Sequence, residues 1–135
     1  MGDTFGYGAR PRYGHYSWDI ANDLIWGDAG LAQIMGLDAT TANDGFSVLR
    51  YLDIVHPDDR ENVAKAIKVA VLSGRPYLVI CRLQRGDDIV TIRNRGTCLR
   101  YRDGLATVAT GMLDVMQVER GAIAAANLPK PVSIP

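Results

Sequence analysis

The chain has 135 residues, which is the size of one domain and too short for a typical two-domain enzyme. Hydrophobic residues make up 47% of the sequence, so we expect the chain to build its own core without disulfides. The 15 basic and 15 acidic residues balance each other. This zero net charge argues against a protein that binds nucleic acid over a broad surface.

Cysteine usage and hydropathy bear on the cellular compartment. Cys81 and Cys98 occur without a CxxC motif or a cluster of cysteines and histidines, which argues against a zinc site or a secreted disulfide scaffold. No apolar run approaches the ~18 residues that span a bilayer, and the first residues lack the hydrophobic segment of a signal peptide. We therefore predict a soluble, cytoplasmic protein with no membrane partner.

Charge is unevenly distributed along the chain. Residues 16–61 carry nine acids and two bases, whereas residues 62–102 carry nine bases and two acids. The two regions are expected to attract each other. Because the bases are spread over a predicted helix and two predicted strands, solvated strand faces are favoured over a phosphate-binding surface, and nucleic acid is not an expected partner.

The first third of the chain predicts short elements. Residues 1–15 are glycine-rich without an apolar period, so we expect a flexible arm. The segments YSWDI and LIW, joined by turn residues, predict a β-hairpin over 16–26. Asp28 then precedes AGLAQIMG, which predicts a two-turn helix that ends at Gly36. The segment DATTANDG at 38–45 consists of loop formers.

The next elements are a short and a long helix. FSVLRYLDIV has apolar residues at helical spacing and predicts a short helix over 46–55. HPDDR at 56–60 is the clearest helix start, because proline suits the first position and the acidic residues suit the positive end of the helix dipole. Val63, Ile67 and Val71 recur every four residues and predict an amphipathic helix of about four turns.

The remainder reads as strands and a tail. YLVICRLQR, IVTIRNRGTCLRY and LATVATGMLDVM, separated by the turns GDD and RDG, predict an antiparallel meander. Residues 117–135 predict a short helix and then an extended, proline-containing tail. The order β-β-α-α-α-β-β-β predicts an α+β fold with a five-stranded antiparallel sheet and helices packed on one face.

These segments, in this order, resemble a known family. WDI, LIWGDAGLAQIMGLD, HPDDRENVAKAIKVAVLSGRPY, CRLQRGDD, RNRGTCLRYRDG and GMLDVM are similar to landmarks of the PAS domain, in particular of the subgroup with an HPDDR motif and a C-terminal PAC segment. The resemblance covers residues 16–116. It implies a sensory or interaction module of bacterial two-component signal transduction.

The resemblance also implies how such a module works. It would be a non-enzymatic module that binds a small ligand or a partner protein and relays the change through its sheet to a histidine kinase or other signalling protein, in cis or in trans. Any kinase or cyclase activity would belong to that partner or to a further domain. Separately from the resemblance, the outward apolar residues of the strand over 77–85 favour a homodimer. Two alternatives stay open: a small α+β-cup enzyme of the isomerase or hydratase type with an acidic base in its pocket, and a ligand-free dimerisation adaptor.

The residues that suggest chemistry have simpler interpretations. Proline excludes helix at His56, so we expect this residue to cap the long helix rather than to act as a catalyst or metal ligand. Haem-binding PAS domains present a histidine from the helices, and none lies in residues 57–74, so haem is disfavoured.

A photoreactive flavin is also disfavoured, and the cofactor is otherwise unknown. CRLQ at 81–84 is similar to the NCRFLQ of flavin photosensors, but their cysteine precedes the long helix whereas Cys81 follows it on a strand. We expect Cys81 and Cys98 to be buried strand residues.

The sequence predicts a pocket and an output surface. The helices and the inner sheet face would enclose an apolar pocket for a small ligand, or the same residues would simply fill a close-packed core. The predicted pocket residues are Trp26, Ile34, Met35, Leu52, Ile67, Val71, Tyr77, Val79, Cys81 and Thr91. The outward residues of the strand over 77–85 need cover from a partner or from the tail helix. The predicted output surface comprises Leu78, Ile80, Arg82, Leu113, Asp114 and Met116.

Overall fold

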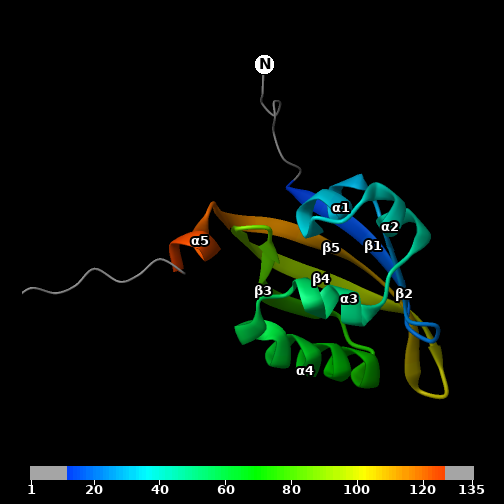
Figure 1. Cartoon of the computed structure of the whole chain (residues 1–135). Helices are drawn as coiled ribbons and strands as arrows, with labels where there is room; N and C mark the ends of the chain where they lie inside the picture. The colour runs from blue at the N-terminus through cyan, green and yellow to red at the C-terminus, as the bar shows by residue number, and fades with distance from the viewer. Residues whose placement is uncertain (1–11, 127–135) are drawn as a thin grey trace, which may run out of the picture.

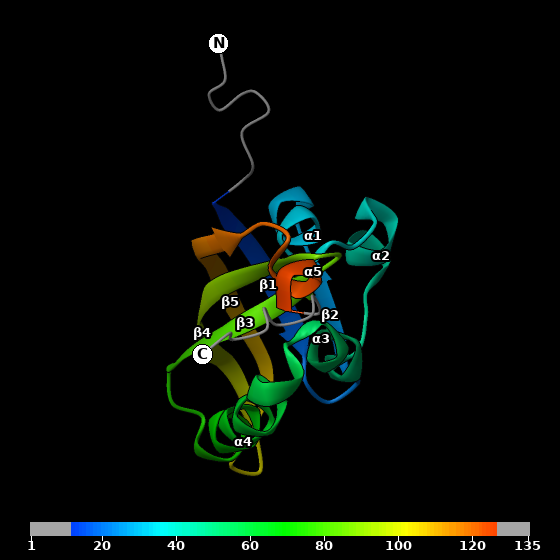
Figure 2. The same cartoon turned by 60° about the vertical axis from the view of Figure 1, so that its left-hand side comes forward.

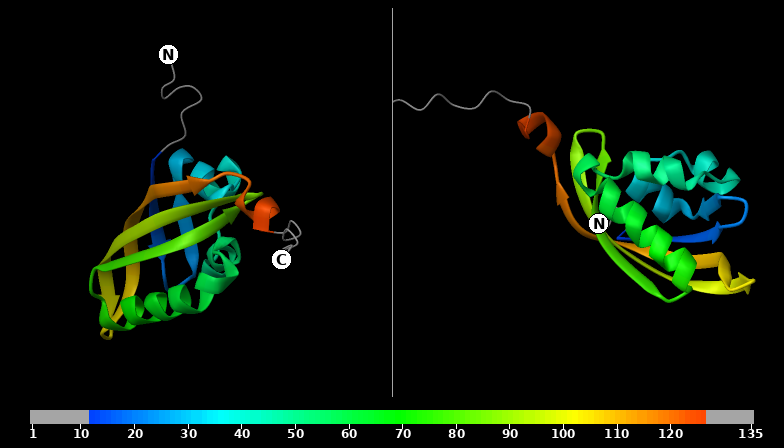
Figure 3. Two further views of the ribbon diagram at one scale, coloured as in Figure 1. Left: turned by 90° about the vertical axis from the view of Figure 1, so that its left-hand side faces the viewer. Right: turned by 90° about the horizontal axis from the view of Figure 1, so that it is seen from below.

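The computed structural model of the chain describes residues 12–126. Its elements are β1 (Tyr13–Asp19), β2 (Leu24–Gly27), α1 (Ala29–Met35), α2 (Ala39–Asp44), α3 (Val48–Ile54), α4 (Pro57–Ser73), β3 (Tyr77–Arg85), β4 (Asp88–Arg102), β5 (Leu105–Glu119) and α5 (Ala122–Ala126). The strands form one antiparallel sheet in the order β2-β1-β5-β4-β3 (Figure 1). Helices α1 to α4 cover one face of this sheet (Figure 3). The predicted α+β class and five-stranded sheet are confirmed.

Two element boundaries near the chain ends differ from expectation. Strand β1 begins at Tyr13 and pairs with β5, so the expectation of a flexible arm does not hold for residues 13–15, and residues 1–11 lie outside the described part. Strand β5 runs to Glu119 because it pairs with β4 beyond a bulge. The expected tail helix is present as α5, whereas residues 127–135 lie outside the described part.

Helix α2 occupies residues that the loop-forming composition of 38–45 predicted to be irregular. Two alanines in this segment have high helix propensity, and Ala42 is buried against the rest of the core. Gly45, with a φ of 106°, then ends the helix, and the chain returns to β2 through a bridge between Phe46 and Ile25. Tertiary burial therefore outweighs the polar character of the segment.

The long helix α4 begins and ends as its sequence predicts. Pro57 is its first residue, and the ring Nδ1 of His56 accepts a hydrogen bond from the backbone N–H of Asp58 at 3.1 Å. Gly74, with a φ of 66°, ends the helix in the left-handed region. His56 is thus a capping residue.

The other polar residues of HPDDR hold the start of α4 in place. The Asp59 carboxylate accepts hydrogen bonds from the backbone N–H of Arg82 at 2.8 Å and from its guanidinium at 2.7 and 3.0 Å. The Arg60 guanidinium donates to the carbonyl oxygens of Asp53 and Val55, both at 3.0 Å. The motif therefore joins α4 to the end of α3 and to the edge strand β3.

The core lies between the helices and the inner face of the sheet. The largest side chains that solvent does not reach are Leu31, Ile34, Val55, Leu83, Val90, Ile92 and Leu113. Cys81 and Cys98 are buried on strands, as predicted, and burial raises the pKa of the Cys81 thiol to about 11. Within residues 12–126 we find no helix long and apolar enough to cross a membrane.

Candidate functional site

A cavity of about 50 Å³ lies between the helices and the inner face of the sheet. Its walls are mostly apolar, and no side chain on them is charged. Five strands, three helices and the segment before α3 contribute its lining, namely Tyr16, Trp18, Ile25, Leu31, Met35, Phe46, Val48, Tyr51, Val63, Ala66, Ile67, Ala70, Tyr77, Val79, Asn94 and Leu113. Such a cavity suits an uncharged ligand, because a charge buried here would have no partner.

The structure divides the ten predicted pocket residues into three groups. Met35, Ile67, Tyr77 and Val79 lie on the cavity wall. Four others pack in or against the core without lining the cavity, namely Ile34, Leu52, Val71 and Cys81. The remaining two, Trp26 and Thr91, lie on the other face of the sheet.

Strand register explains the misplaced pair. Trp26 pairs with Ser17 and is 37% exposed, because its neighbour Ile25 takes the inward position. Thr91 pairs with Arg82, whereas the residues on either side of it are buried. Successive strand residues face opposite sides, so assigning the wrong phase of the alternation moves a residue to the opposite face.

Several lining residues were not predicted, although the sequence carries a signal for some of them. Tyr16 and Trp18 alternate in YSWDI as inward strand residues do, and Tyr51 follows Val48 by three residues on α3. On α4 the lining stripe includes two alanines that a search for large apolar residues overlooks. Asn94 had no such signal because a polar side chain at an inward strand position is uncommon.

The polar groups of the cavity wall bond mainly to one another. The Tyr16 hydroxyl lies 2.5 Å from that of Tyr77 and donates to Asn94 Oδ1 at 2.7 Å. The Tyr51 hydroxyl lies 3.6 Å from Cys81 Sγ. Burial raises the pKa of all three tyrosines, so the phenols stay protonated at neutral pH.

One polar group on the wall lacks a partner. The indole N–H of Trp18 is buried and makes no hydrogen bond within the described residues. A buried donor left unpaired costs about 1–3 kcal/mol, so this group is a potential contact for an acceptor.

The predicted output residues also fall into distinct environments. Leu78 and Ile80 are 58% and 55% exposed on the outer face, and Met116 lies exposed at the bulge of β5. Leu113 is wrongly assigned to this surface, because it faces inward, is 1% exposed and lines the cavity. Arg82 faces outward but is bound to Asp59 of α4, as described above.

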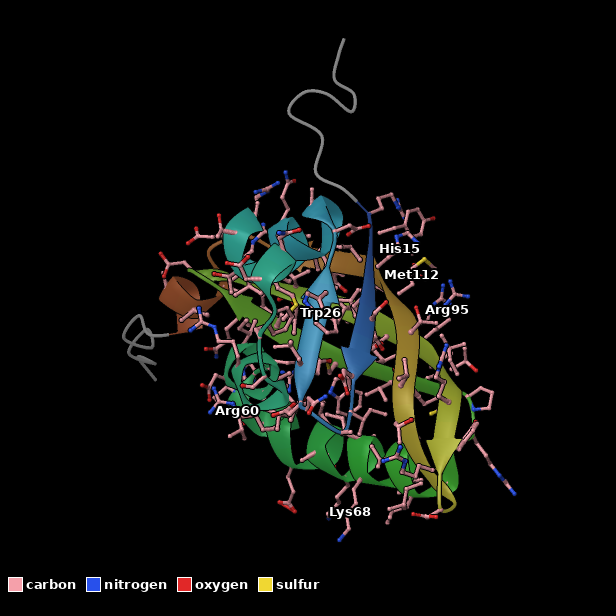
Figure 4. The ribbon with its side chains drawn as sticks, turned by 90° about the vertical axis from the view of Figure 1, so that its right-hand side faces the viewer. His15, Trp26, Arg60, Lys68, Arg95 and Met112 are labelled. Carbon is pink, nitrogen blue, oxygen red and sulfur yellow. The ribbon has the colours of Figure 1, made fainter. Side chains whose placement is uncertain are left out.

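The sixth output residue, Asp114, is buried on the outer face beneath two arginines. Its carboxylate is bonded by the Arg93 guanidinium, and Arg95 lies 3.4 Å from it. His15, Met112 and Arg95 share this face, away from the helices (Figure 4). Helix α5 lies against the turn between β3 and β4, where the Ile123 N–H donates to the Asp87 carbonyl at 3.0 Å (Figure 2). It therefore leaves Leu78 and Ile80 uncovered, so that of the two expected covers, the tail helix and a partner, the tail helix is not the one that covers them.

The sequence of the chain matches a known family, and its fold matches those of known proteins. The family model described as the PAS fold matches residues 25–112. The chain belongs to the PAS fold family. This match confirms the family that the sequence resembles. It also confirms the general role expected of that family, a sensory module of signal transduction. PAS domains as such are sensory, non-catalytic units.

Similar solved structures come from signalling proteins. A sensory box histidine kinase/response regulator from Burkholderia thailandensis matches with a TM-score of 0.65 and 23% identity, over 78% of this chain and 77% of that one. The N-terminal domain of a diguanylate cyclase with PAS/PAC sensor from Marinobacter aquaeolei matches with a TM-score of 0.67 and 16% identity, over 76% and 94%.

A domain of a putative light and redox sensing histidine kinase from Haloarcula marismortui matches with a TM-score of 0.63 and 14% identity, over 78% of this chain and 90% of that one. No curated protein matches the chain. At these identities the likeness concerns the fold, so the ligand and the partner of this chain have to be argued from its own residues.

Proposed function

We propose that this PAS module binds a small, uncharged, largely apolar molecule in its cavity and relays the change through the sheet to a partner. The cavity itself carries the proposal. Its volume of about 50 Å³ exceeds the roughly 10–15 Å³ that one water needs and is smaller than the ~150 Å³ cavity that holds benzene. The absence of charge on its walls argues for a neutral ligand.

The same dimensions bear on larger cofactors. A haem or a flavin would require the helices to move away from the sheet, because either is larger than benzene. Neither His15 nor His56 is among the lining residues, and the Cys81 thiol bonds to Tyr51 rather than facing an open site. These observations favour a small molecule over a haem or a photoreactive flavin.

The output surface of the proposal is the outer face of β3 and its neighbours. Leu78 and Ile80 expose apolar side chains next to Arg95 and Arg93, their partners on β4. Exposed apolar residues on a sheet face favour a protein partner. We propose that a second copy of the chain, a histidine kinase or another signalling protein of a two-component system docks here, in the cytoplasm.

Two alternatives make different predictions for the purified chain. The small-enzyme alternative requires a general base, yet the lining residues within the described part include no carboxylate and no histidine. The adaptor alternative draws support from the exposed pair on β3 and requires no ligand. Native mass spectrometry of the full chain separates these functions. A retained small molecule supports the sensor, whereas a ligand-free dimer that takes up no small molecule supports the adaptor.

A further inference from the structure

A row of paired residues crosses all five strands of the sheet on its inner face. The register places Gly27 of β2 opposite Tyr16 of β1, Tyr16 opposite Gly111 of β5, Gly111 opposite Gly96 of β4, and Gly96 opposite Tyr77 of β3. The two tyrosines therefore flank two adjacent glycines in the middle of the sheet.

The glycines are what allow the tyrosines to meet. A Cβ atom on Gly96 would lie 2.1 Å from the Tyr77 hydroxyl, and one on Gly111 would lie 2.3 Å from the Tyr16 hydroxyl. Each ring thus lies over the glycine of the neighbouring strand. The two hydroxyls meet above β4 and β5 and join β1 to β3, which are not neighbours in the sheet. We call this contact the tyrosine bridge.

The protons of the tyrosine bridge have a defined direction. The Tyr16 hydroxyl donates to Asn94 Oδ1, which accepts only, so its single proton is used there. The short contact between the phenols then requires Tyr77 to donate to Tyr16. The Tyr77 oxygen keeps its lone pairs and has no proton left to give, so it is an acceptor on the cavity wall.

We propose that the tyrosine bridge, through the Tyr77 oxygen, accepts a hydrogen bond from a donor group on the ligand. The cavity would thereby select a small neutral molecule with an apolar body and one hydroxyl or N–H group. Such a donor extends the chain of hydrogen bonds from the ligand through Tyr77 and Tyr16 to Asn94. A ligand that only accepts would take the Tyr77 proton, which would break either the bond between the phenols or, if the Tyr16 hydroxyl turned to Tyr77, its bond to Asn94 Oδ1. This inference rests on the proposed function, since it names the ligand class of the same cavity.

The test uses two probes of the same size that differ in this property. Propan-2-ol carries a hydroxyl donor, and acetone carries an acceptor alone. We expect the amide NMR signals of Gly96 and Gly111 in the full chain to shift saturably with both probes, with propan-2-ol bound about fivefold more tightly, the worth of one hydrogen bond. Tyr77→Phe keeps the ring and should abolish this preference while changing acetone affinity less than twofold.

A matched control and the contrary outcomes complete the test. Tyr51→Phe removes another phenol from the same wall and should leave the preference intact. A preference that survives in Tyr77→Phe overturns the inference, as does tighter binding of acetone to the unaltered chain, which would place recognition at the unpaired Trp18 N–H. Equal binding of both probes overturns the inference but leaves the sensor proposal standing. Saturable binding of neither probe overturns both.

Discussion

Strand β3 presents apolar residues to both sides, yet the two sides meet different surroundings. On the inner side Cys81 and Leu83 are buried beneath the helices, whereas on the outer side Leu78 and Ile80 are largely exposed. Hydrophobicity alone therefore does not identify the inner face of this strand; the cover provided by the helices does. The exposed pair is the more informative feature, because contiguous exposed apolar side chains mark interaction sites whereas single ones are common on any surface.

The polar groups of the two faces differ in the same way. Inside, phenols and an amide bond to one another without any charge, so the cavity suits neutral molecules. Outside, the charges are partly paired: Asp114 is 5% exposed and bonded to Arg93, while the arginines stay partly open to solvent. These differences support the two proposals made above, a small ligand at the inner face and a protein surface with apolar and acidic groups at the outer face.

The same charge placed on each face of β3 should have different consequences for folding. Leu83 is 0% exposed, and an unpaired carboxylate there costs several kcal/mol, a large share of the roughly 5–15 kcal/mol that stabilises a domain. Leu83→Asp should therefore unfold the chain, whereas Ile80→Asp should change the free energy of unfolding by about 1 kcal/mol or less. Urea unfolding followed by circular dichroism measures both.

The outer-face variant also tests the output surface. Burial of two such aliphatic side chains is worth about 1.5–3 kcal/mol each, enough to shift a docking equilibrium at least tenfold. Ile80→Asp should weaken self-association or partner binding in sedimentation experiments while the monomer stays folded. An unchanged oligomer with unchanged partner affinity would place the output surface elsewhere, and an unfolded variant would mean that the two faces are reversed.

A smaller effect comes from the contact between β1 and α1 on the inner face. A Cβ atom on Gly14 would lie 2.5 Å from the backbone N and Cα of Leu31, so the helix would have to move away. We expect Gly14→Ala to lower the free energy of unfolding by about 3 kcal/mol. Ser17→Ala, on the outer face of the same strand, should change it by about 0.5 kcal/mol or less. Equal urea midpoints for the two variants would contradict this packing.

Sequence patterns predict the order of the elements well where local chemistry decides. The start of α4 at Pro57, its end at Gly74 and the cap at His56 follow from rules that act within a few residues. The five strands and their antiparallel pairing follow from alternation and turn residues. Local chemistry misses α2, because its formation depends on a burial site for Ala42 that other elements create.

The candidate site is harder to predict because it depends on register. Whether Ile25 or Trp26 faces inward is decided by pairing with β1, which neither residue reveals by itself. The tyrosine bridge joins residues 61 positions apart and exists because two glycines fall between them across the sheet. Such long-range coincidences carry no local signal, so the cavity wall could be predicted only in part.

Arg82 of the edge strand β3 is bonded to Asp59 of α4. The pH dependence of stability tests what this contact contributes. The hydrogen bonds from Arg82 hold the pKa of Asp59 below its ordinary value. A lowered folded-state pKa means that the carboxylate stabilises the fold above its unfolded pKa of about 4, and that this contribution is lost as the pH falls through the lowered value.

Asp59→Asn should therefore lower the free energy of unfolding by about 1–2 kcal/mol at pH 7, and the difference from the unaltered chain should shrink toward pH 3. Urea unfolding over this pH range measures the effect. Glu61→Gln is the control, because Glu61 pairs with Lys65 on an exposed helix face and should matter by about 0.5 kcal/mol or less. A difference that stays constant with pH would exclude the ionic contribution of Asp59.

The smallest expected effect concerns the neighbouring cap. The ring of His56 accepts a hydrogen bond from the backbone N–H of Asp58, and the backbone N–H of His56 donates to the Arg82 carbonyl oxygen at 2.8 Å. His56→Ala removes only the ring contact, so it should lower the free energy of unfolding by about 1 kcal/mol and leave the fold and any bound ligand in place. His56→Asn restores a capping oxygen and should recover most of the loss. Loss of a bound ligand at unchanged stability would instead place His56 in a binding role, and failure of asparagine to rescue would show that the imidazole acts through something other than the cap.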